Sequence, residues 1–276
     1  MKEKRLIMGM PIEIEIVDNG PTSPLLRPRL RKGTARLRRA SAKDALEAAF
    51  AYLVSVDTRF STYKEDSEIS RINRHSHILE NVRMSETKGQ ISEEMREVFD
   101  IAERAKKETN GYFDIRRPKG IIDPSGVVKG WAIRNTAAII RAAGHSDFMV
   151  NAGGDIASSG KNAKGEEWSF GIRNPFNSHE IVKVVYPHEK GIATSGSYIR
   201  GDHIYNPHQP EEKLRDIVST TVIGPDVLEA DLMATAAFAM GKGGIAFIEN
   251  LSGFEGYAID AKGIATMTSG FAAYTK

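Results

Sequence analysis

Apolar residues recur with two different periods along this chain, and the order of those periods restricts its fold. At residues 12–16 every second residue is isoleucine with glutamates between, which predicts a half-buried strand. At residues 41–58 the apolar residues instead recur at helical spacing and form one stripe. Strand-like and helix-like segments occur in groups without strict alternation. This order favours an α+β fold with mixed, largely antiparallel sheets and packed helices.

The remaining elements follow from the same patterns and from capping residues. A helix is expected near residues 92–108, with Ser92 as its N-cap, and another from Lys129 to Gly144. Strands are expected at 147–151, 167–173, 181–186 and 217–223, and a helix follows the last of them. At 276 residues the chain exceeds the usual length of one domain. We expect one domain over residues 1–276, which could be divided into two lobes.

Composition excludes several classes of function. The 38 basic and 36 acidic residues are too balanced to indicate nucleic acid or a membrane as a partner of the whole surface. The absence of cysteine excludes disulfides, thiolate metal sites and cysteine nucleophiles. Pro11 interrupts the apolar start, and no run approaches a signal sequence or a membrane span, so we expect a cytoplasmic protein. Residues 25–43 hold eight basic side chains and no acidic one, and we expect a solvated loop there.

One short stretch places an acid and a hydroxyl on the same side of a helix. In EADLMATAAFAM, residues 229–240, Asp231 and Thr235 are four positions apart and therefore about one turn apart on one face. Their oxygens would suit a hard cation such as Mg²⁺. Alternatively, Asp231 caps the helix and Thr235 bonds a backbone carbonyl. On this stretch alone we favour the second interpretation.

Three glycine-containing stretches leave a functional and a structural interpretation open. Residues 122–131 run from a turn into a helix beginning near Lys129. This junction is either a phosphate-binding site or an ordinary helix start capped by Ser125. Residues 151–160 indicate either a ligand close to the backbone or a hairpin turn. In residues 194–207, His203 is a general base or a structural residue.

Taken in chain order, eight segments resemble one family, the FAD:protein FMN transferases or ApbE proteins. Any one segment is weak, whereas eight in the right order are specific. They are MGMP (8–11), FSTYKEDSEISRIN (60–73), NGYFDIRR (110–117), IDPSGVVKGWAI (122–133), NAGGDI (151–156), WSFGIRNP (168–175), IATSGSYIRGDHIYNP (192–207) and VIGPDVLEADLMATAAFAMG (222–241).

The resemblance implies an ApbE-like (T-fold-like) fold and a set of site residues. It implies that Mg²⁺ is bound by Asp231, Thr235 and the backbone carbonyl of Gly126, and that His203 is the catalytic base. The residues that it implies for FAD are Met8, Tyr63, Tyr112, Phe113, Asp114, Asp123, Lys129 and Ile204.

The implied activity is Mg²⁺-dependent transfer of the FMN moiety of FAD to a threonine hydroxyl of an acceptor protein, with release of AMP. The expected partners are therefore FAD and an acceptor flavoprotein. If water is the nucleophile, the same site is an FAD diphosphatase that yields FMN and AMP. A flavin-binding module without catalysis is the remaining alternative.

Overall fold

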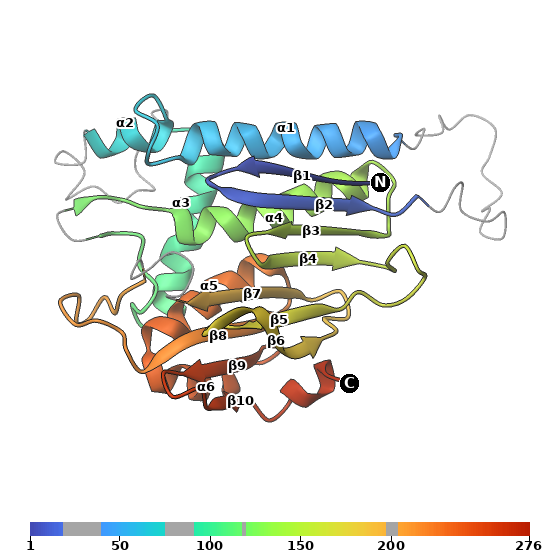
Figure 1. The fold of residues 1–276 in the computed structure, drawn as a ribbon. Helices are drawn as coiled ribbons and strands as arrows, with labels where there is room; N and C mark the ends of the chain where they lie inside the picture. Colours follow the sequence, from blue (N-terminus) through green and yellow to red (C-terminus); the bar gives the residue numbers. More distant parts are fainter. Residues whose placement is uncertain (19–39, 75–90, 118–119, 197–203) are drawn as a thin grey trace.

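A computed structural model describes residues 1–18, 40–74, 91–117, 120–196 and 204–276. Its main sheet has eight strands in the order β1-β2-β3-β4-β7-β8-β9-β10, and neighbouring strands are antiparallel (Figure 1). These strands are β1 (Lys2–Ile7), β2 (Met10–Ile16), β3 (Phe148–Ala152), β4 (Asp155–Ser159), β7 (Gly191–Gly196), β8 (Ile217–Gly224), β9 (Glu255–Asp260) and β10 (Ala265–Met267). A separate antiparallel hairpin consists of β5 (Phe170–Asn174) and β6 (Asn177–Val185). The predicted α+β class is confirmed.

Helices and the hairpin cover opposite faces of the main sheet (Figure 1). The helices are α1 (Ala42–Phe60), α2 (Glu68–Arg74), α3 (Glu93–Glu108), α4 (Ser125–Ala142), α5 (Val227–Ala239) and α6 (Gly244–Glu249), with 3₁₀ turns η5 (Gly241–Gly243) and η6 (Phe271–Tyr274). Of these, α1, α4 and α5 pack on one face, and the β5–β6 hairpin packs on the other. No helix in the described part of the chain is long and apolar enough to cross a membrane.

The alternation of side chains along each strand divides the interior into two cores. In β7, Ala193 belongs to the large core shared with the helices, whereas its neighbour Ile192 belongs to the smaller core under the hairpin. In β2 the three isoleucines of residues 12–16 are fully buried in the large core, as their period predicts.

The expected helices at 41–58 and 92–108 are confirmed, and Ser92 Oγ accepts a hydrogen bond from the Met95 amide at 3.2 Å. The expected start of α4 near Lys129 is wrong, because the helix begins at Ser125. Its N-cap is Pro124 and not Ser125. The Ser125 amide donates to Asp123 Oδ1 at 3.1 Å, so the aspartate satisfies one of the unpaired amides at the helix start.

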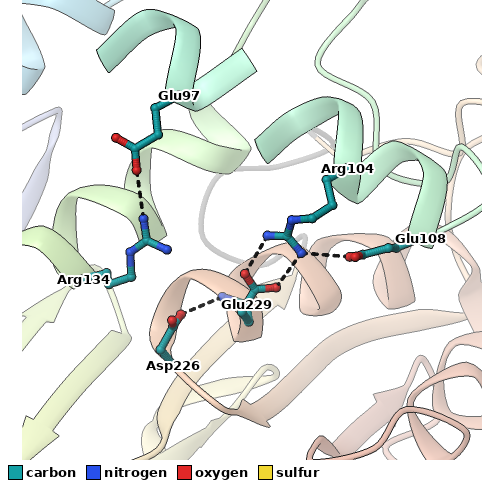
Figure 2. A network of polar contacts seen from close by, with 6 residues as sticks. All are labelled: Glu97, Arg104, Glu108, Arg134, Asp226 and Glu229. Atoms are coloured by element: carbon teal, nitrogen blue, oxygen red, sulfur yellow. Dashed lines mark hydrogen bonds and ion pairs between the residues drawn. The ribbon is translucent and has the colours of Figure 1, made fainter. Parts of the chain in front are cut away.

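Charged contacts join α3 to the start of α5 (Figure 2). Arg104 of α3 binds both carboxylate oxygens of Glu229, at 2.6 and 3.1 Å, and also contacts Glu108 at 2.9 Å. Asp226 Oδ1 accepts from the Glu229 amide at 3.0 Å and is the N-cap of α5. The interpretation of Asp231 as the cap is therefore wrong, and Asp231 lies inside the helix.

Candidate functional site

A cleft opens where the start of α4, the middle of α5, the end of β7 and the loop after α3 meet. Segments more than 100 positions apart in the sequence contribute to its lining. The expected site residues that line it are Tyr112, Phe113, Asp114, Asp123, Gly126, Lys129, Ile204, Asp231 and Thr235. The fold thus brings together the expected cation ligands and most of the residues expected to bind FAD.

Two buried acids face one lysine in this cleft. Asp231 of α5 is 4% exposed, and its Oδ2 accepts a hydrogen bond from the Gly130 amide of α4 at 3.1 Å. Asp155, at the start of β4, is fully buried and accepts the Thr194 amide of β7 at 3.1 Å. The Lys129 ammonium forms an ion pair with Asp155 and lies 4.0 Å from Asp231 Oδ1. Both acids therefore contact the backbone of a neighbouring element, which fixes their orientation.

The pKa of Asp231 is raised in this cleft. Burial, with a smaller contribution from the nearby Asp155, raises it to about 8 against the opposing effect of Lys129. A bound cation is a large local charge and would favour the ionised carboxylate.

Asp231 and Thr235 line the same cleft, as their spacing on a helix predicts. Thr235 Oγ1 lies 3.3 Å from Ser195 Oγ on β7, so this hydroxyl is positioned by a strand as well as by its own helix. Ser195 also lines the cleft. Sequence reasoning did not select Ser195, because its proximity to Thr235 depends on the packing of α5 on β7.

The first turn of α4 approaches the aromatic wall of the cleft closely. A Cβ atom placed on Gly126 would lie 3.2 Å from Phe113 Cε2, so glycine allows this approach. The Phe113 amide in turn donates to Thr109 Oγ1 at 3.0 Å, which ties the wall to the end of α3.

Asp114 and Asp123 are held by neighbouring cations. Asp114 Oδ2 lies 2.6 Å from Lys106 Nζ, and Asp123 Oδ2 lies 2.8 Å from a terminal nitrogen of Arg117. Arg117 lines the cleft too, with its guanidinium 5.7 Å from the centre of the Tyr205 ring. Sequence reasoning missed Arg117, Tyr205 and the pairing of Asp155 with Lys129.

Three expected site residues are not part of the described cleft. Met8 lies in the β1–β2 turn with φ 54°, and Tyr63 is 97% exposed; neither lines the cleft. Their contact with FAD stays a prediction. His203 lies outside the described residues, as does most of the basic segment 25–43. Ile204, the residue after His203, lines the cleft.

The two glycines of NAGGDI join β3 to β4. Gly153 and Gly154 have φ values of 61° and 105°, which confirms the hairpin interpretation. Gly153 also lines the cleft, so the turn borders the site.

Known proteins resemble this chain over most of its length. The sequence model of the ApbE family matches residues 8–119 and 116–258. The FAD:protein FMN transferase of Vibrio cholerae serotype O1 is 25% identical over 238 residues, 69% of this chain and 71% of that protein. The FAD:protein FMN transferase of Salmonella typhimurium is 32% identical over 133 residues, 45% of this chain and 38% of that protein.

Solved structures share the fold. The flavin transferase ApbE from Vibrio cholerae has a TM-score of 0.78 at 22% identity, covering 99% of this chain and 98% of its own. The ApbE protein from Thermotoga maritima has a TM-score of 0.79 at 19% identity, covering 100% of this chain and 99% of its own. Because the family's sequence model matches well over half of the residues, the chain belongs to the ApbE family.

Proposed function

We propose that this protein transfers the FMN moiety of FAD to a threonine hydroxyl of an acceptor protein and releases AMP. The main observation behind the proposal is that one cleft is lined by Lys129, by the start of α4, and by the carboxylate of Asp231 and the hydroxyl of Thr235 from one face of α5. The relatives named FAD:protein FMN transferases support the same reaction.

The start of α4 and Lys129 suit the diphosphate of FAD. The first turn of a helix presents backbone amides and the positive end of the helix dipole, which favour phosphate. Gly126 lies in that turn and Lys129 one turn further along, and both line the cleft. The ammonium and the helix start would therefore bind the same anionic group.

The chemistry of the donors fits Mg²⁺. The Asp231 carboxylate, the Thr235 hydroxyl and the Gly126 carbonyl are the hard oxygen ligands that this ion prefers. The Gly130 amide holds Asp231 Oδ2 at 3.1 Å and orients the carboxylate. When bound, Mg²⁺ would neutralise phosphate charge and stabilise the departing AMP.

In the proposed reaction, the threonine oxygen forms a bond to the phosphorus on the FMN side of FAD. The bond from this phosphorus to the bridging oxygen breaks, and that oxygen leaves with AMP. We propose that His203 takes the hydroxyl proton. In support, the following residue, Ile204, lines the cleft. If water replaced threonine as the nucleophile, the same site residues would hydrolyse FAD to FMN and AMP.

The test is to incubate the protein with FAD and Mg²⁺, with and without candidate acceptor proteins. AMP is measured by chromatography, and covalent flavin by in-gel fluorescence and mass spectrometry of the acceptor. Transfer predicts AMP together with a flavin-bearing threonine, and both should disappear when EDTA removes Mg²⁺. AMP with free FMN alone would indicate the diphosphatase. Unchanged FAD in every sample would refute both reactions and leave flavin binding.

A further inference from the structure

We propose that a groove on the sheet face opposite the helices binds an extended segment of the acceptor protein, beside the threonine that receives FMN. We call it the hairpin groove. It lies between the β5–β6 hairpin and the strands β2, β3 and β4. This proposal rests on the function proposed above and adds the surface that the acceptor occupies.

The hairpin groove adjoins the cleft. Gly153 and Thr194 line both, so the groove borders the site of the proposed reaction. The groove has a volume of about 690 Å³, against about 130 Å³ for the cleft. The groove therefore offers the larger space beside the site of the proposed reaction.

The floor of the groove changes from polar to apolar across the sheet. Glu13 of β2 pairs with Asn151 of β3, Asn151 pairs with Ile156 of β4, and Ile156 pairs with Ile192 of β7. All four side chains belong to one cross-strand row and line the groove. A floor that is polar at one end and apolar at the other can contact both polar and apolar side chains of a polypeptide.

Strand β5 of the hairpin forms a wall of the groove. The four consecutive residues 170–173 all line it. Because side chains alternate along a strand, contact with four residues in succession includes backbone as well as side-chain atoms. Among the strands that the structure describes, β5 pairs only with β6, so its other edge offers backbone donors and acceptors. An extended segment can pair with such an edge as an added strand.

An exposed apolar side chain marks the rim. Ile181 of β6 pairs with Arg173 across the hairpin, lines the groove and is 48% exposed. Val184 of the same strand is 45% exposed but does not line the groove. The two residues form a matched pair, because they have similar chemistry and exposure and differ in their position relative to the groove.

The test compares Ile181→Asp with Val184→Asp in two reactions. AMP release from FAD without acceptor reports on the cleft, and flavin transfer reports on the cleft and the acceptor together. The acceptor is the protein that becomes covalently flavinylated in the assay above. We expect Ile181→Asp to raise the KM for the acceptor about tenfold, the scale of one lost interface contact, with the acceptor-free AMP release unchanged. Val184→Asp should match the wild type within about twofold in both reactions.

Other results would overturn the groove proposal. Equal effects of the two substitutions would show that the groove is not the docking surface. A higher KM for FAD in Ile181→Asp without acceptor would indicate that the flavin itself occupies the groove. Failure of the proposed function is distinguishable, because the wild type would then release no AMP or flavinylate no protein.

Hydrogen exchange tests the strand addition in the unmodified protein. The probe is a synthetic peptide spanning the modified threonine of the acceptor. We expect it to slow exchange of amides in residues 170–174, whereas a peptide of scrambled sequence should not. Protection confined to other elements would overturn the proposal.

Discussion

Replacing Gly130 by alanine should push α4 away from α5 and loosen the acid at the centre of the cleft. A Cβ atom at this position would lie 2.8 Å from Leu228 Cα and 3.1 Å from Asp231 Cβ. Ordinary carbon contacts are about 3.5 to 4.0 Å, so the helices would have to separate by roughly 0.7 Å or more. The hydrogen bond from the Gly130 amide to Asp231 Oδ2, now 3.1 Å, would be disturbed at the same time.

The size of the effect follows from two opposing terms. Overpacking a buried site costs about 1 to 3 kcal/mol, whereas alanine in place of glycine favours the helix by about 1 kcal/mol. The free energy of unfolding should therefore fall by about 1 kcal/mol, which lowers Tm by roughly 2 to 4 °C. Loss of a partner that orients a metal ligand costs about 10- to 100-fold in metal affinity, so we expect Mg²⁺ affinity to fall at least about tenfold.

Urea unfolding and Mg²⁺ titration of AMP release would measure the two effects of Gly130→Ala. Gly243→Ala is the control, because a Cβ atom there would meet no atom within 4 Å. It should leave Mg²⁺ affinity unchanged and the free energy of unfolding within about 1 kcal/mol. If Gly130→Ala matches this control in both measurements, the reasoning about the contact between α4 and α5 is refuted.

Three further substitutions test other parts of the site. Asp231→Asn should abolish the rise in Tm that Mg²⁺ produces. It should not lower the Tm of the metal-free protein, because a neutral amide replaces a buried acid. An undiminished rise with Mg²⁺ would exclude Asp231 as a ligand. Arg104→Ala removes both hydrogen bonds to Glu229 and should lower the free energy of unfolding, measured with urea, by about 1 kcal/mol. Arg134→Ala removes a single contact at 3.2 Å and should lower it by less than about 0.5 kcal/mol. Equal losses would contradict this order. His203→Asn should slow flavin transfer about 10²- to 10⁴-fold while the binding of FAD, followed by flavin fluorescence, is unchanged; a wild-type rate would mean that another group takes the proton.

Local patterns in the sequence determined the elements whose stability depends on near neighbours in the chain. Isoleucines alternating over residues 12–16 predict β2, since a strand buries every second residue. Ser92 predicts the start of α3, because its hydroxyl reaches an amide three residues later. Asp231 and Thr235 share a face of α5 because four positions make about one turn. The predicted start of α4 was four residues too late, since the side chain that satisfies an amide at the true start is Asp123, which lies outside the helix.

Only the tertiary structure decided which of these elements meet. The strands β4 and β7 are short, contain serine and alanine, and lack a clear period. They are strands because neighbouring strands pair with them. Asp155 contacts Lys129 because β4 and α4 pack together, although 26 positions separate the two residues. Such contacts depend on the order of strands and on the face each helix covers. The sequence thus determined which side chains could carry the chemistry, and the packing of α4 and α5 on the sheet decided which of them act at one place.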